Sequence, residues 1–237
     1  MAVNLRGRIT LTALVGLSLT QLLGAGIGKW LPTSSSYPHL ASAVFAGAML
    51  LVIAGAPQHH PFPRFGAANL VTTVRLGLAS MVAASVAQPI SASAAWFVVA
   101  LAALATMLDG VDGWLARRSG LASELGARFD VETDAFFILT LSVLVWRFDK
   151  AGAWVLGCGL MRYAFVAAGW TLPWMGGHLT PTWRGKTVAV VQLIGLGLAL
   201  SPLLRRPAST VVAAATLLLL GWSFAIDVRR LRHASRI

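Results

Sequence analysis

Carboxylates that could bind metal ions are concentrated in one short stretch of this chain. The 237 residues include six aspartates and two glutamates, and four of the aspartates and both glutamates lie in the 26-residue window 109–134. Long apolar segments flank this window. Ionised carboxylates beside apolar segments repel one another and are costly unless cations neutralise them. Divalent cations held by oxygen ligands are therefore the first chemistry that the pattern indicates.

The spacing of the aspartates predicts that all four side chains meet. Asp109 and Asp112 are three residues apart near the end of one expected helix, and Asp130 and Asp134 are four apart at the start of the next. Residues three or four apart share a helix face. The short connection at 118–128 predicts that the two helices are antiparallel neighbours. Four converging carboxylates suit two hard divalent ions about 3.5–4 Å apart, an arrangement used in phosphoryl chemistry.

Two glycines and an arginine complete this polar pattern. Gly113 follows Asp112 directly and leaves room for a ligand to approach the backbone. Gly126 lies one turn before Asp130 and allows close helix packing. Arg117 lies one turn beyond Gly113, where a guanidinium could bind a phosphate oxygen.

The elements that must position these residues are membrane helices. Hydrophobic residues make up 57% of the chain and charged residues 11%, whereas soluble domains carry about 25% charged residues. Apolar segments long enough to cross a hydrocarbon core of about 30 Å recur along the sequence. The expected fold is all-α, a transmembrane bundle of about eight helices near residues 10–31, 38–56, 69–89, 93–116, 131–147, 151–172, 186–204 and 208–226.

The basic residues predict the orientation of these helices. If the N-terminus is cytoplasmic and the helices alternate, most Arg and Lys residues fall on the cytoplasmic side, as the positive-inside rule requires. We assign the net charge of +11 to contact with anionic lipid headgroups and expect no nucleic-acid partner. Both termini are then expected in the cytoplasm. Arg75 and Arg162 lie inside expected helices and need a separate explanation.

Three sequence elements together resemble one enzyme family. At all eight specified positions, the window resembles the signature of the CDP-alcohol phosphotransferases: Asp109-x2-Asp112-Gly113-x2-Ala116-Arg117-x8-Gly126-x3-Asp130-x3-Asp134. The segment 69–75, with Asn69, Thr72 and Arg75, resembles the element that opens the first catalytic helix of the family, although Ala68 replaces the usual proline.

The third element bears on the acceptor substrate. Gly185-Lys186 with Gln192 resembles an element of phosphatidylglycerophosphate synthases, but Val188 and Ala189 stand where that element has Lys and Thr. In total the resemblance covers about residues 62–230. We therefore expect two regions, an N-terminal transmembrane hairpin at 1–60 and a catalytic domain at 61–237.

The resemblance implies a membrane enzyme of phospholipid biosynthesis with a six-helix catalytic core. Such enzymes transfer a phosphatidyl group from CDP-diacylglycerol to an alcohol and release CMP. By carry-over from the family, two Mg²⁺ or Mn²⁺ ions are bound by Asp109, Asp112, Asp130 and Asp134. Asp134 would also act as general base on the acceptor hydroxyl. The cytidine diphosphate would be held by Asn69, Thr72, Gly113 and Arg117.

The resemblance and the basic residues of the later helices together favour a small phosphorylated alcohol as acceptor. Arg162, Lys186 and Arg184 could bind its phosphate, and glycerol 3-phosphate is the simplest such alcohol. Inositol phosphate, serine, phosphatidylglycerol and a CDP-choline-type donor stay open, as does homodimerisation. A divalent-cation transporter is the alternative from another class. The expected location is the bacterial inner (plasma) membrane, with the active site facing the cytoplasm.

Overall fold

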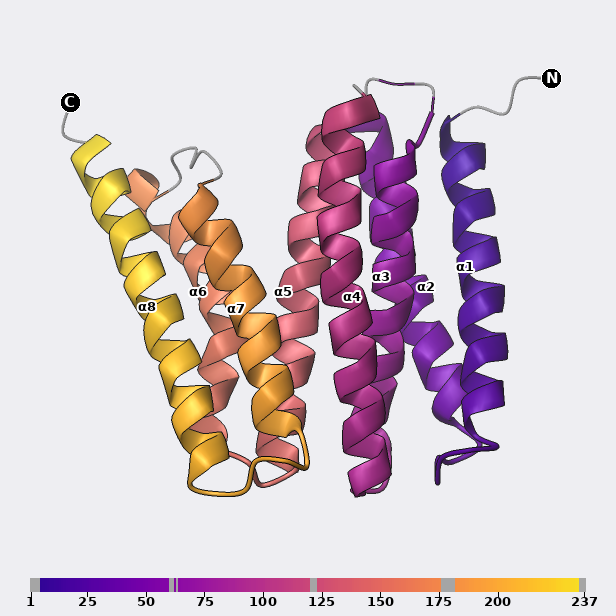
Figure 1. Cartoon of the computed structure of the whole chain (residues 1–237). Coiled ribbons are helices and arrows are strands. Elements are labelled where there is room, and N and C mark those ends of the chain that lie inside the picture. Colours follow the sequence, from indigo (N-terminus) through magenta and orange to yellow (C-terminus); the bar gives the residue numbers. More distant parts are fainter. Residues whose placement is uncertain (1–4, 60–61, 63, 120–122, 176–181, 235–237) are drawn as a thin grey trace. The chain divides into compact units, whose positions relative to one another are not determined.

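The protein folds into α-helices. The computed structural model describes residues 5–59, 62, 64–119, 123–175 and 182–234, and within these ranges it contains helices and no strand. The described ranges contain eight α-helices, which Figure 1 shows in sequence colours. Their bounds are α1 Leu5–Ile27, α2 Tyr37–His59, α3 Ala67–Ala84, α4 Ala92–Ser119, α5 Glu124–Arg147, α6 Gly157–Thr171, α7 Trp183–Leu200 and α8 Ala208–Ala234. Three short 3₁₀ turns are Ser85–Ala87, Ala153–Leu156 and Pro173–Met175.

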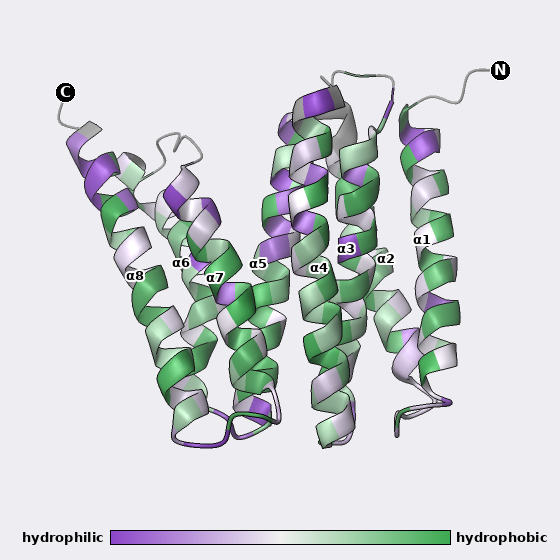
Figure 2. Ribbon diagram, in the orientation of Figure 1, coloured by the Kyte–Doolittle hydropathy of each residue, from purple (hydrophilic) through white to green (hydrophobic). Residues whose placement is uncertain are grey.

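The predicted all-α membrane fold is confirmed. Among the described residues, six segments are long and apolar enough to cross a membrane, namely α1, α2, α4, the segment formed by α3 with the turn after it, the one formed by α6 with the turn before it, and α8. Hydrophobic residues dominate most of the helix lengths in Figure 2. The two other helices carry charged residues, with Glu124 to Asp134 in α5 and Arg184 and Lys186 in α7. The chain is an integral membrane protein.

Several helix boundaries differ from the expected ones by a few residues, and for two of them the charged residues give the reason. The apolar run predicts that the fifth helix starts near 131, but α5 begins at Glu124. Its first turns are polar, and an ion pair of 2.7 Å joins Glu124 to Arg128 one turn later. The last helix likewise continues past 226 to Ala234, with Arg232 and His233 in its last turn. Basic side chains are favourable at a helix C-terminus, beyond the apolar part.

The chain divides into two compact units, 1–137 and 138–237, and the boundary falls within α5. In the first unit, α3 packs against α4, and the α1–α2 hairpin packs against α3. In the second unit, α7 packs against α8, which also contacts α6. The proposed division at residue 60 stays a prediction.

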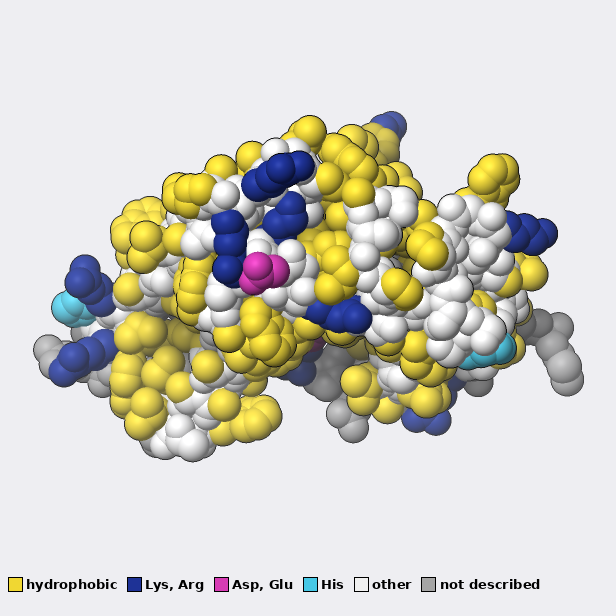
Figure 3. Space-filling model, turned by 90° about the horizontal axis from the view of Figure 1, so that it is seen from below, with side chains coloured by type: hydrophobic (Ala, Val, Ile, Leu, Met, Phe, Trp, Pro, Cys, Tyr) yellow, Lys and Arg dark blue, Asp and Glu magenta, His cyan; other side chains and the backbone are white. Residues whose placement is uncertain are grey.

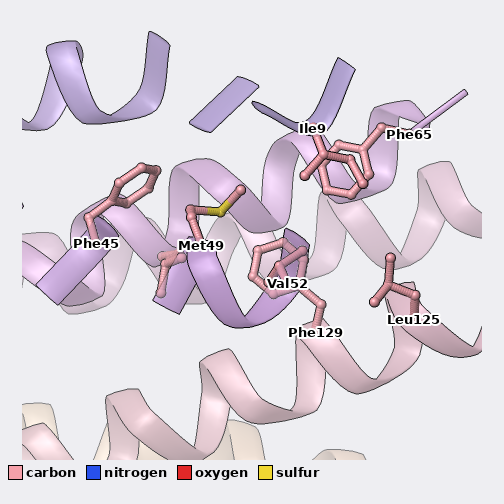
Figure 4. Close-up of a cluster of buried hydrophobic side chains, with 8 residues drawn as sticks. Ile9, Phe45, Met49, Val52, Phe65, Leu125 and Phe129 are labelled. Carbon is pink, nitrogen blue, oxygen red and sulfur yellow. The ribbon is translucent and has the colours of Figure 1, made fainter. Parts of the chain in front are cut away.

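A hydrophobic cluster in the first unit joins the N-terminal hairpin to the start of α5. Figure 4 shows side chains of α1, α2, the segment before α3, and α5 gathered in this cluster. Its buried members are Ile9, Phe45, Met49, Val52, Phe65, Leu76, Leu125 and Phe129. Leu76 follows Arg75, and Phe129 precedes Asp130. The cluster therefore fixes the helix segments from which polar residues of the candidate site project.

In the second unit, hydrogen bonds join the connection after α5 to the connection between α7 and α8 and to the start of α8. Lys150 donates from Nζ to the carbonyl oxygens of Ser201 at 2.8 Å and Leu204 at 2.5 Å, just after α7. The hydroxyl of Ser209, in the first turn of α8, donates to the Lys150 carbonyl at 2.7 Å. Figure 3 shows basic side chains and an acidic group set among hydrophobic ones on one face of the molecule. The hydrogen bonds of Lys150 and Ser209 give partners to carbonyl groups in the connections after α5 and α7.

Candidate active site

The site begins with a buried polar face on α3. Asn69, Thr72 and Arg75 are spaced by three residues, so they lie along one side of the helix. All three are buried, and the Arg75 side chain is 2% exposed. The Thr72 hydroxyl donates to the carbonyl of Ala68 at 3.1 Å and to Asp112 Oδ2 at 3.2 Å. A buried arginine in an apolar helix requires anionic partners close by.

The aspartates of α4 and α5 supply those partners. Carboxylate oxygens of Asp109, Asp112 and Asp130 all lie within 4.8 Å of one another. Asp112 is buried, whereas the Asp130 side chain is 39% exposed. The structure thus brings the end of α4 and the start of α5 together, as the spacing predicts, and leaves the Asp130 side of the cluster the more open.

Arg75 lies among all four aspartates. Its Nη1 donates to Asp112 Oδ2 at 2.7 Å and to Asp130 Oδ1 at 2.6 Å. Its Nη2 lies 2.9 Å from Asp109 Oδ1 and donates to Asp134 Oδ1. The sequence placed Arg75 inside a helix and within the 69–75 element that resembles the family, but it gave this arginine no role. Its place three residues after Thr72, in step with Asn69, was the signal that it faces the site.

Close packing between α3 and α5 depends on Gly126. A Cβ atom built on Gly126 would lie 2.6 Å from Asn69 Oδ1, a separation that real Cβ atoms almost never show. The Asn69 amide donates from Nδ2 to the Phe65 carbonyl at 2.5 Å. The Ser123 hydroxyl accepts from the Gly126 backbone N–H at 3.1 Å, in the first turn of α5. The absence of a side chain at Gly126 therefore leaves room for Asn69 of α3 one turn before Asp130.

The two remaining residues expected at the nucleotide lie further along α4. Gly113 follows Asp112 and is partly exposed. Arg117 belongs to the last turns of α4, but its side chain lies outside the described part of the structure. Nucleotide binding by Asn69, Thr72, Gly113 and Arg117 stays a prediction.

The residues expected at the acceptor belong to the second unit. Arg184 forms an ion pair with Asp227 of α8 and lies 6.0 Å from the centre of the Trp222 ring. Its Nε and Nη1 atoms are buried and have no hydrogen-bond partner among the described residues. Lys186 is exposed near the start of α7, and Arg162 is half-buried in α6. Asp227 is a partner that sequence reasoning missed, because 43 residues separate it from Arg184. Binding of the acceptor phosphate by Arg162, Lys186 and Arg184 stays a prediction.

The donor set of the aspartate cluster fits a hard divalent cation. Such ions prefer carboxylate oxygens, and Mg²⁺ takes them at about 2.1 Å, so opposite ligands lie about 4.2 Å apart. Neighbouring ligands of an octahedral ion lie about 3 Å apart, so three oxygens within 4.8 Å of one another are near the spacing that one ion requires. Four carboxylates and one guanidinium leave three net negative charges when all are ionised. The cluster could therefore hold a divalent cation.

Comparison with known proteins identifies the family. Residues 65–226 match the family model of the CDP-alcohol phosphatidyltransferases. Proteins named probable phosphatidylglycerophosphate synthase in two strains of Mycobacterium tuberculosis, CDC 1551 / Oshkosh and ATCC 25618 / H37Rv, are similar to the chain. Each is 31% identical over 164 residues, which cover 64% of this chain and 75% of the relative. No solved structure matches. The chain belongs to the CDP-alcohol phosphatidyltransferase family, transferases of phospholipid biosynthesis.

Proposed function

We propose that the protein transfers a phosphatidyl group from CDP-diacylglycerol to glycerol 3-phosphate and releases CMP. The observation that carries the proposal is the meeting of Asp109, Asp112 and Asp130, with Asp134 joined to them through Arg75. These aspartates lie inside the segment that matches the family. The same arrangement would serve any acceptor alcohol, so the acceptor needs its own argument.

The four aspartates are proposed to hold two Mg²⁺ or Mn²⁺ ions, which would neutralise the diphosphate and stabilise the departing CMP. Asp109, Asp112 and Asp130 contribute the oxygens that already lie close together. Asp134 is proposed to ligate as well and to accept the proton of the attacking hydroxyl as general base. Attack is expected at the phosphorus that carries the lipid, in line with the leaving oxygen.

The cytidine diphosphate is proposed to bind at the faces of α3 and α4 that border the aspartates. Thr72 already reaches Asp112 through its hydroxyl, and Asn69 lies one turn before it. Gly113 leaves its side of α4 free of a side chain, and Arg117 would supply a cation for a phosphate oxygen. The proposed orientation puts these residues on the cytoplasmic side of the inner membrane, where a soluble acceptor is available.

A phosphorylated acceptor is supported by the second unit and by the relatives. The buried Nε and Nη1 donors of Arg184 are satisfied by no described protein group, although Asp227 pairs with Nη2. Buried donors without partners are costly, and a phosphate oxygen would satisfy them. The name probable phosphatidylglycerophosphate synthase, given to the two relatives, favours glycerol 3-phosphate over the other acceptors. Arg162 and Lys186 are proposed to complete the phosphate site.

A direct assay tests the proposal. The purified protein in detergent micelles is supplied with CDP-diacylglycerol, Mg²⁺ and one alcohol at a time, and CMP release is measured. The expected acceptor is glycerol 3-phosphate, and CDP-choline is included as an alternative donor with a diacylglycerol acceptor. Turnover with free serine or phosphatidylglycerol, and none with glycerol 3-phosphate or another alcohol phosphomonoester, would exclude the acceptor but keep the enzyme class. Metal uptake into sealed vesicles without CMP release from any pair would favour a transporter.

A further inference from the structure

The Arg75 guanidinium occupies the middle of the carboxylates proposed to bind metal. Both of its Nη atoms pair with aspartates of α4 and α5. The N–O distances to Asp109, Asp112 and Asp130 are 2.6–2.9 Å. Its Nε is buried and has no hydrogen-bond partner among the described residues. Within the part of the chain that the structure describes, aspartates thus hold the guanidinium, and the side chain is 2% exposed.

A guanidinium and a divalent ion make competing demands on this cluster. Both are cations, both draw on the same carboxylates, and a guanidinium has only donors, so it cannot ligate a metal. Arg75 already pairs with one oxygen of each aspartate, so an ion that draws on these oxygens has to share or displace the contacts. Without any cation, four buried or half-buried carboxylates from α4 and α5 would repel one another and separate. The Arg75 guanidinium, which pairs with all four aspartates, offsets part of this repulsion.

We propose that Arg75 is a built-in counter-cation, which holds the four aspartates together before metal binds and gives up part of these ion pairs when metal binds. The inference rests on the proposed function, since it takes the aspartates as metal ligands. The metal site is then assembled before the ion binds, and its affinity for metal is lower than it would be without Arg75. Arg75 thus acts as a positioning residue through the aspartates.

The test replaces the cation by a shorter, neutral polar side chain, Arg75→Gln. The variant should bind Mn²⁺ about tenfold more tightly, because the ion no longer has to displace a paired guanidinium. In EDTA it should unfold at least about 5 °C below the wild type, and saturating Mn²⁺ should remove most of that difference. A residue with only a structural role would lower stability equally with and without metal.

Both quantities are measured on the full chain in detergent micelles. Free Mn²⁺ is followed by its electron paramagnetic resonance signal, and unfolding by heating in EDTA or in Mn²⁺. Arg206→Gln is the matched control, because Arg206 pairs at 3.0 Å with the exposed Asp149 of the second unit. This control should leave the Mn²⁺ dissociation constant unchanged. Arg75→Lys, which keeps one positive charge but has fewer donors, should fold without metal and bind Mn²⁺ with intermediate affinity.

The outcomes separate this inference from the proposed function. Absence of Mn²⁺ binding by the wild type would overturn the metal site and thus the proposed function. Mn²⁺ binding by the wild type, with equal or weaker binding by Arg75→Gln or Arg75→Lys, would overturn only the counter-cation role. Tighter binding by these variants, together with metal-dependent recovery of stability, would establish it.

Discussion

Gly126→Ala should disturb the site by a single added methyl group. The new Cβ would lie 2.6 Å from Asn69 Oδ1, and relief to at least 3.0–3.4 Å needs a displacement of about 0.4–0.8 Å. Asn69 cannot turn away without losing the 2.5 Å hydrogen bond to the Phe65 carbonyl. Either α5 moves away from α3, or Asn69 leaves its position. Both responses alter groups proposed to serve catalysis.

The expected magnitude follows from this displacement. If α5 moves, the 2.6 Å contact between Arg75 and Asp130 lengthens by a similar amount. A misplacement of 1 Å at a reacting centre can cost about a hundredfold in rate, so we expect CMP release to fall about tenfold. Overpacking costs about 1–3 kcal/mol, and the helix preference of alanine over glycine returns up to about 1 kcal/mol. The variant should therefore fold, with slightly lowered stability.

The assay compares CMP release and thermal unfolding for three purified variants. Gly110→Ala is the matched control, since it also lies beside an aspartate of the cluster but its Cβ would meet no atom within 4 Å. That variant should keep wild-type turnover. Adding Asn69→Ala to Gly126→Ala should recover stability, because it removes the atom that the methyl group meets. Gly126→Ala with wild-type turnover and stability would refute the reasoning.

Three further predictions concern the proposed chemistry. Asp130→Asn, or treatment of the wild type with EDTA, should abolish CMP release while the protein remains folded, and full turnover in EDTA would contradict the metal site. Asp134→Asn should lower kcat by about 10²–10⁴-fold with a smaller effect on CDP-lipid binding, measured by equilibrium binding of CDP-diacylglycerol; a kcat near that of the wild type would move the base role to another residue. Arg162→Ala should raise KM for glycerol 3-phosphate about tenfold or more and leave KM for the CDP-lipid nearly unchanged; equal changes in both constants would remove Arg162 from the acceptor site.

Local properties of the sequence were enough to predict the elements and the aspartate cluster. Runs of apolar residues set the helices, because a hydrocarbon core admits only segments with internally satisfied backbone groups. The spacing of Asp109 with Asp112, and of Asp130 with Asp134, set each pair on one helix face. A short connection then left little freedom in how the two pairs could meet. The start of α5 at Glu124 was missed, because a hydropathy pattern does not register a polar first turn.

The tertiary structure alone decided which distant residues complete the site. Arg75 is 37 residues from Asp112 and 59 from Asp134, and no local spacing relates it to them. Its role depends on how α3 is rotated against α4 and α5, which is set by packing such as that of Gly126 against Asn69 and of Phe129 in the hydrophobic cluster. Sequence periodicity specifies which residues share a face, whereas side-chain packing between helices determines which faces meet.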